Sequence, residues 1–329
     1  MNRRSFLRNL ALGAAGGYSA LLAGCVSTEP QPEPGVVKYS NTPDQAELIT
    51  DPHFLKGFQL VDPEARTSNY GVWCPFFETK PIWKLAQWHT IQKLSPNGMQ
   101  RTASRDSAQI SNDCKAVTVT TPGHSRSDLI LEVLGNTEYQ GTPRVGDEPW
   151  VHLLVEQAIE AKPRLVDLTA LNFHLEARLL FSKLYKPKQF DETKHAAQYQ
   201  VFFYLQDANR KSEGYGEMIW FGVPVYDNRE WMTDRYEAAD FAGSGMFICT
   251  LAHEDVCPDS AHGGKWITLE ADLLPQMKEA FSIAQKKGFM QKTKSLEDIR
   301  LTGMNMGWEV PGLLDVSLQV RDLSLRCES

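Results

Sequence analysis

The sequence lacks a surplus of basic residues and the short motifs that mark nucleotide chemistry. It has 34 Lys and Arg against 41 Asp and Glu, a formal charge of −7. Proteins that hold nucleic acid by charge carry an excess of Lys and Arg, so no nucleic-acid partner is expected. A Gly-rich phosphate loop, a Gly-x-Ser-x-Gly elbow and a Cys-x-x-Cys pair are also absent from the sequence. These absences predict no cofactor and no metal.

Cysteine is scarce. One of the six, Cys25, ends the first apolar run, and the other five are Cys74, Cys114, Cys249, Cys257 and Cys327. Five is an odd number, so at least one thiol is free or pairs between chains. A body of this length can bury a core without disulfides, so one internal disulfide or none is compatible with the sequence. The short loop between them makes Cys249 and Cys257 the expected pair.

The chain has one apolar run of note, and it lies at the start. Three arginines precede residues 10–22, and Ala23-Gly24 follows. This is the order of an export signal peptide, and the run is shorter than the ~20 residues of a spanning helix. We therefore expect residues 1–24 to be removed, which leaves 31 basic against 41 acidic residues, a formal charge of −10.

Two short motifs in this segment resemble known signals for export and lipidation. Residues 2–8, with Arg3 and Arg4, resemble the twin-arginine export signal, which implies the Tat translocase as a partner and a cargo that crosses already folded. Leu22-Ala23-Gly24-Cys25 resembles the lipobox of bacterial lipoproteins. That likeness implies cleavage and acylation at Cys25 by lipoprotein-processing enzymes, hence a lipid anchor in the membrane. The expected location is the cell envelope, on the periplasmic side or at the outer membrane.

The rest of the chain divides into a tether and one domain. Residues 25–40 hold the lipidated Cys and a Pro-rich tether, in which residues 27–34 include three prolines and no apolar side chain. Residues 41–329 show no internal repeat and no second long break, so they are expected to form one domain.

Alternation with a period of two dominates this domain. In residues 171–179, apolar side chains alternate with polar ones, and residues 314–320 repeat the pattern. Further strands are predicted at 83–88, 116–120, 129–134, 198–205, 218–225, 246–251, 266–269 and 300–304. About ten strands with few helices predict a mainly all-β fold, an antiparallel jelly-roll β-sandwich with one or two peripheral helices.

Two helices are expected. Apolar residues at three- and four-residue spacing predict a helix over 273–287, with Pro275 in its first turn and Gly288 at its end. A second helix is predicted over residues 150–161.

Over residues 80–326 this arrangement resembles the concanavalin A-like lectin and glucanase jelly rolls, whose concave face binds extended sugar chains. The chain is also similar to exported bacterial proteins of unassigned function, through residues 149–157 and 307–312. The resemblance implies a carbohydrate ligand. The paired carboxylates of laminarinase-type glycosidases are not reproduced, since Pro275 replaces the second Glu in residues 270–275. Residues 174–178 keep only part of an alginate-lyase motif.

The first candidate site is the polar stripe of the strand at 171–179, formed by Asn172, His174, Glu176 and Arg178. Residues two apart project together, so on a concave face the stripe would present an acid, a base and a cation to one ligand, beside Gln319 and Arg321. On a solvated face, Glu176 and Arg178 would form an ordinary ion pair worth ~0 to 1 kcal/mol.

The second candidate site follows the strand at 218–225 and contains Glu217, Trp220, Tyr226, Asp227 and Arg229. Aromatic rings beside carboxylates suit sugar recognition, while core packing is the alternative. Trp220 and Phe221 point to opposite faces of a strand, so at most one of them belongs to a site. His253, Glu254, Asp255 and His262 match no compact zinc spacing and indicate a loop.

Three functions follow from these patterns. The leading hypothesis is a lipoprotein that binds a polysaccharide or glycan. The alternatives are a carbohydrate-active hydrolase or lyase that uses Glu176 or Glu217 with His174 and Arg178, and a structural envelope protein.

Overall fold

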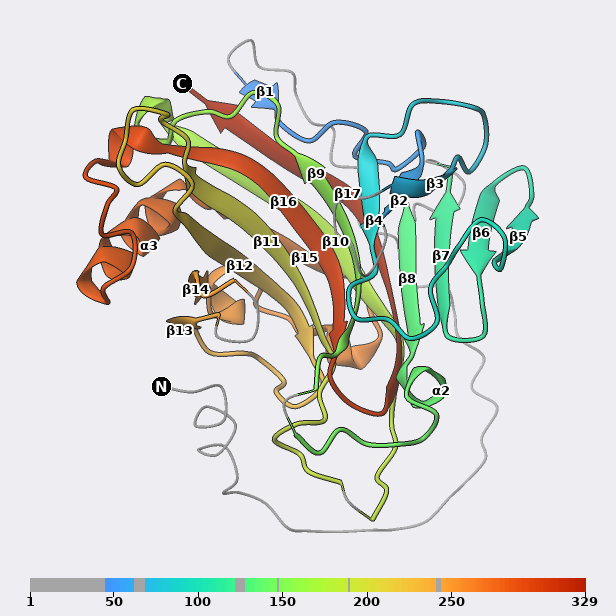
Figure 1. Ribbon diagram of the computed structural model, residues 1–329. Coiled ribbons are helices and arrows are strands. Elements are labelled where there is room, and N and C mark those ends of the chain that lie inside the picture. The colour runs from blue at the N-terminus through green and yellow to red at the C-terminus, as the bar shows by residue number, and fades with distance from the viewer. Residues whose placement is uncertain (1–44, 62–68, 122–127, 147, 189, 241–243) are drawn as a thin grey trace.

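The chain folds as a two-layer β-sandwich. The computed structural model describes residues 45–61, 69–121, 128–146, 148–188, 190–240 and 244–329, so Arg3, Arg4, Cys25 and the Pro-rich tether lie outside the described residues. Figure 1 shows helix α3 (Leu274–Lys286) at one end of the layers and strands β5 and β6 at the other. This is the predicted jelly-roll class of fold.

Each layer is one sheet. Within the described residues, sheet A has the order β15-β10-β17-β8-β7-β6-β5, with β1 also paired to β17. Its strands are β1 (Gln45–Glu47), β5 (Gln100–Ala103), β6 (Ser107–Ser111), β7 (Lys115–Thr120), β8 (Leu129–Leu134), β10 (Ala170–Leu184), β15 (Ile267–Asp272) and β17 (Leu314–Glu328). A short helix, α2 (Gly135–Glu138), follows β8.

Sheet B has the order β13-β14-β12-β11-β16-β9-β4-β2-β3 over the same described ranges. Its strands are β2 (Phe58–Val61), β3 (Asn69–Trp73), β4 (Trp83–Ala86), β9 (Val151–Ala158), β11 (Gln198–Asp207), β12 (Met218–Asp227), β13 (Tyr236–Ala239), β14 (Phe247–Thr250) and β16 (Ile299–Val310). Pairing is antiparallel except at β2/β4 and β12/β14, which are parallel.

The core lies between the two sheets, and strand β11 shows how alternation builds it. Tyr199, Val201 and Phe203 are buried, whereas the residues between them are only half-buried. Phe203 meets Phe173 of sheet A edge-on, with ring centroids 5.8 Å apart. Trp308 of sheet B donates its indole N–H to the Leu131 carbonyl of sheet A at 2.9 Å. The opposite face of β11 is therefore the outer face of the sandwich.

The expected helix over residues 150–161 is wrong, because this segment is strand β9. Three consecutive residues, Leu153, Leu154 and Val155, are buried there, and β9 lies in the interior of sheet B between β16 and β4. The alternation is interrupted at Leu154, and a short apolar run of this kind cannot be told from a buried helix by periodicity. Among the described helices, none is both long and apolar enough to cross a membrane.

The expected disulfide between Cys249 and Cys257 is also wrong. Both thiols are free and buried, Cys249 in strand β14 and Cys257 beside the Asp259 carbonyl, to which its Sγ donates at 3.2 Å. Burial raises the pKa of the Cys249 thiol to about 11, so it stays protonated and unreactive at neutral pH.

Candidate ligand-binding groove

Two hollows lie next to each other on the outer face of sheet B. The first, about 180 Å³, is lined by Gln198, Gln200 and Phe202 of β11, and the second, about 640 Å³, begins at Tyr204 and Gln206 of the same strand. These residues are successive positions on one face, so the hollows follow one another along roughly 26 Å of strand. We call the two together the groove.

Trp220 packs between the two hollows, against Phe202, which lines the first, and against Tyr204, which lines the second. It pairs with Tyr204 across the β11/β12 ladder, and its ring centroid is 4.8 Å from that of Tyr204 and 6.1 Å from that of Phe202. Its indole N–H donates to the Ser244 hydroxyl at 2.9 Å, which fixes the ring. Phe221 is buried in the core, as the alternation indicates. The middle of the groove is therefore an aromatic surface.

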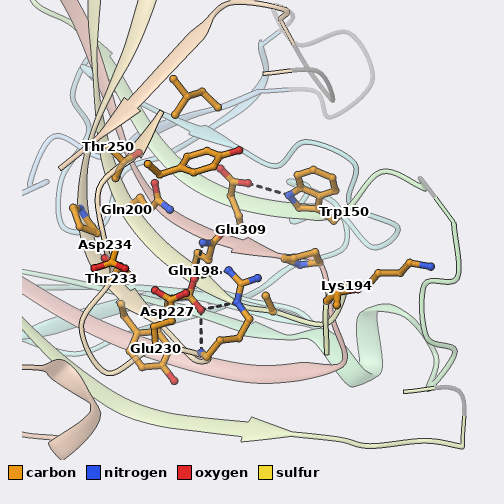
Figure 2. A pocket seen from close by; sticks show the side chains of 18 of the residues that line it. Trp150, Lys194, Gln198, Gln200, Asp227, Glu230, Thr233, Asp234, Thr250 and Glu309 are labelled. Atoms are coloured by element: carbon orange, nitrogen blue, oxygen red, sulfur yellow. Dashed lines mark hydrogen bonds and ion pairs between the residues drawn. The ribbon is translucent and has the colours of Figure 1, made fainter. Parts of the chain in front are cut away.

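Asp227 forms a rigid polar floor in the first hollow. It is 3% exposed and accepts hydrogen bonds from Arg229 Nε at 2.9 Å, from Arg229 Nη2 at 2.6 Å and from Gln198 Nε2 at 2.7 Å. Figure 2 shows the side chains of Asp227 and Gln198 next to each other in the hollow. A bidentate Arg–carboxylate pair holds both side chains in one geometry.

Three further carboxyl groups line the same hollow, those of Glu230, Asp234 and Glu309. Glu309 of β16 is opposite Gln198 in the ladder and accepts the indole N–H of Trp150 at 3.0 Å. Glu230 follows β12, and its pKa is raised, first by burial and then by the charge of Asp227. A carboxyl group of this kind holds a proton more readily than an exposed Glu.

Two buried polar atoms in the first hollow have no hydrogen-bond partner among the described residues. They are the amide oxygen of Gln200 and the hydroxyl of Thr233. A buried polar atom without a partner costs ~1–3 kcal/mol, so a ligand that supplies hydroxyl groups would recover that free energy.

The polar stripe of β10 lies on sheet A, away from the groove. Glu176 pairs with Arg321 in the ladder, and the Nε of Arg321 donates to Glu176 Oε2 at 2.5 Å with both side chains buried. The guanidinium of Arg321 also lies 3.9 Å from the ring centroid of Trp266. The expected Glu176–Arg178 pair is therefore wrong, and Arg178 donates instead to the Gly264 carbonyl at 3.0 Å.

The remaining stripe residues also have partners on sheet A. The imidazole of His174 lies 3.4 Å from Glu270 of β15, and Asn172 donates to Glu328 of β17 at 3.4 Å. Gln319 is opposite Arg178 in the ladder. The structure thus brings the stripe together with Gln319 and Arg321 as expected, but on a different sheet from Asp227.

The second predicted group is divided by the structure. Asp227 and Arg229 meet in the first hollow, and Trp220 packs against Phe202 and Tyr204 farther along β11. Glu217 accepts the backbone N–H of Thr293 at 2.9 Å and its hydroxyl at 2.8 Å, so it ties two loops together. Tyr226 is 5% exposed and packs in the core, with its ring centroid 5.8 Å from that of Trp308, although it also reaches the wall of the first hollow.

Sequence reasoning missed several groove residues. They are Trp150, Gln198, Gln200, Glu230, Thr233 and Glu309. The alternation of β11 could have pointed to Gln198 and Gln200, which share a face with Phe202 and Tyr204. The contact of Trp150 with Glu309 spans 159 residues of sequence, and no local pattern signals it. In the part of the chain that the structure describes, no three His, Cys, Asp or Glu side chains are placed to hold a metal ion.

Comparisons with known proteins find similarity in structure only. No protein-family model matches the chain, and no curated protein matches it in sequence. Among solved structures, the native family 12 xyloglucanase from Bacillus licheniformis is 9% identical, with a TM-score of 0.40, over 71% of this chain and 98% of that one.

Two other solved structures are similar to the same degree. The xyloglucanase domain of NopAA from Sinorhizobium fredii, in complex with cellobiose, is 9% identical, with a TM-score of 0.37, over 72% of this chain and 100% of that one. Endoglucanase cel12A from Rhodothermus marinus is 9% identical, with a TM-score of 0.36, over 69% and 94% of the two chains. At these TM-scores the likenesses carry no argument about ligand or reaction.

Proposed function

We propose that this protein binds a polysaccharide or glycan along the outer face of sheet B. The observation that carries the proposal is the succession of two hollows on one face of β11, with the rings of Phe202, Tyr204 and Trp220 packed together where the hollows adjoin. The C–H faces of sugar rings pack on aromatic side chains, and their hydroxyls bond to carboxylates and amides. The unpartnered oxygens of Gln200 and Thr233 suit such hydroxyls.

Affinity electrophoresis of the purified protein against a panel of polysaccharides tests this proposal. At least one polysaccharide should retard the native chain, and Trp220→Ala should weaken that retardation about tenfold, since it removes the stacking surface. Trp231→Ala is the matched control, because Trp231 is 64% exposed and its ring packs on His262 and not on Phe202 or Tyr204. No retardation by any polysaccharide would favour the structural envelope role instead.

Hydrolysis of the bound chain is the second candidate function, favoured by the carboxyl groups of the first hollow. Glu230, whose pKa is raised, would donate the proton to a leaving oxygen, and Glu309 is the second carboxyl across Gln198. Release of reducing ends that Glu230→Gln and Glu309→Gln both abolish would support this activity. The residues His174, Glu176, Arg178 and Glu217 lie outside the groove, so this second candidate function does not involve them. Catalysis by these four residues stays a separate prediction.

We also infer that the protein is an extracytoplasmic lipoprotein anchored through Cys25. Residues 2–8 and 22–25 support this inference by their resemblance to the twin-arginine signal and the lipobox. The groove would then face the polysaccharides of the cell envelope or of the surroundings.

A further inference from the structure

The second hollow differs from the first in its charge. Its wall carries four cationic side chains, Lys84, Lys162, Arg210 and Arg300, against two acidic ones, Glu156 and Glu160. The first hollow has three cationic residues, Arg144, Lys194 and Arg229, against four acidic ones, Asp227, Glu230, Asp234 and Glu309. The second hollow is thus locally positive in a chain whose formal charge is −7.

One cation of the second hollow is already neutralised. The Nζ of Lys84 lies 3.7 Å from Glu156 Oε1 on the neighbouring strand. Glu156 is mostly buried, and this burial raises the pKa of its carboxyl. Lys162, Arg210 and Arg300 therefore remain to face Glu160 alone, an excess of positive charge at one end of the groove.

The fold brings these three cations together. Arg300 of β16 is opposite Gln206 of β11 in the ladder, and its Nη1 donates to the Lys162 carbonyl at 3.0 Å. Lys162 and Arg210 lie in the loops that follow β9 and β11, the two strands that flank β16. Both side chains are exposed. The hollow is therefore open to solvent and rimmed by cations from three segments.

We propose that the glycan bound in the groove is acidic, with a carboxylate or sulfate group seated in the second hollow against Arg210, Arg300 and Lys162. A guanidinium presents parallel N–H donors that match the oxygens of a carboxylate or sulfate. A positively lined hollow also attracts anionic ligands from solution. The aromatic junction at Trp220 and the first hollow then hold the uncharged part of the same chain. This inference rests on the proposed glycan binding and adds the chemical class of the ligand.

Calorimetric titration of the purified protein with three classes of oligosaccharide tests the inference: a neutral glucan, a uronate-containing glycan and a sulfated glycan. The acidic classes should bind at least about tenfold more tightly than the neutral one, because hydrogen bonds to charged groups are the stronger ones. This preference should shrink as salt is raised. Comparison of the titrations with the uronate-containing and the sulfated glycan shows which anionic group the hollow binds.

Substitutions locate the effect in the second hollow. Arg210→Ala alone, and together with Lys162→Ala, should remove the preference, so that acidic and neutral glycans bind the variants with about equal affinity. Both side chains are exposed and lie in loops outside the core, so these variants should fold. Arg101→Ala on the exposed strand β5 of sheet A is the matched control, and it should change nothing.

Two outcomes overturn the inference, and they differ in what they say of the proposed function. Equal affinity for neutral and acidic glycans, with no effect of Arg210→Ala, would reject the acidic ligand and keep the glycan-binding groove. Absence of binding by all three classes would reject both.

Discussion

Glu176 and Arg321 form a buried ion pair on sheet A, and the guanidinium of Arg321 lies against the ring of Trp266. Taking two charges out of water is costly, and the pair persists because each ion compensates the other. Removal of one partner leaves the other buried and uncompensated. A catalytic Glu, by contrast, needs access to its substrate.

We expect Arg321→Met to lower the free energy of unfolding by ~3–5 kcal/mol, the usual cost of breaking a buried ion pair. Urea denaturation at neutral pH measures this change. Arg178→Ala is the control, since Arg178 is exposed, and it should shift stability by less than about 0.5 kcal/mol. Equal effects of the two variants would contradict the structural role of the pair.

His53 predicts a pH dependence of stability. Its Nδ1 lies 2.9 Å from Asp128 Oδ2, and the hydrogen bond to Asp128 raises the pKa of the imidazole above 6.5. The folded protein thus binds this proton more tightly than the unfolded chain does. The stabilisation is complete below pH 6.5 and is lost as the pH rises through the higher folded pKa.

We therefore expect His53→Ala to be destabilising at about pH 5.5 and nearly neutral at about pH 8.5. The side chain of His53 is 41% exposed, so the difference should stay below ~1 kcal/mol. Urea denaturation of both proteins at the two pH values gives the comparison. A loss of stability that grows towards high pH would contradict the assignment.

At the scale of the strand, prediction from sequence worked where one face is buried and the other is not. Strands β10 and β17 alternate over long stretches, and both were predicted with their core-facing residues. Strand β9 was mistaken for a helix because Leu154, on the same face as His152 and Glu156, is apolar and buried, so the alternation breaks there. The pattern that distinguishes strand from helix is the pattern of partial exposure, and it vanishes where exposure does.

A substitution at Gly307 of β16 tests how closely β16 packs against β9 in sheet B. The φ of Gly307 is +147°, and a Cβ at this position would lie 2.2 Å from the Leu153 carbonyl oxygen of β9. We expect Gly307→Ala to cost at least ~1–3 kcal/mol through backbone strain, measured as a shift of the urea midpoint. Gly263→Ala is the control, because nothing lies within 4 Å of a Cβ there. Unchanged stability of Gly307→Ala would mean that β16 and β9 can separate locally.

At the scale of the molecule, only some of the groove residues could be predicted from the sequence. Trp220, Asp227 and Arg229 could be predicted because they lie within ten residues of one strand and its turn. Glu309, Trp150 and Gln200 join them only through the pairing of β16, β9 and β11, which are far apart in the sequence. The polar stripe that includes His174 and Glu176 was predicted in the same way, from residues close together on one strand. The topology places that strand, β10, in sheet A, on the other layer.

The lipid anchor proposed at Cys25 gives the last prediction. Without residues 1–24 the formal charge is −10, and anionic lipid repels such a surface. Each buried CH₂ of an acyl chain contributes about 0.8 kcal/mol, so two or more chains on Cys25 would give durable attachment. We expect Cys25→Ser to move the protein from the membrane fraction to the soluble fraction, and Arg3→Lys with Arg4→Lys to leave the precursor uncleaved.

Fractionation of cells followed by mass spectrometry of the N-terminus distinguishes the two variants. Residues 45–329 should unfold at the same urea concentration in the Cys25→Ser variant as in the native chain, because Cys25 lies before the folded body. Retention of Cys25→Ser in the membrane fraction, with an intact Met1, would remove the extracytoplasmic location. The acidic ligand proposed for the groove would then be one that is present inside the cell.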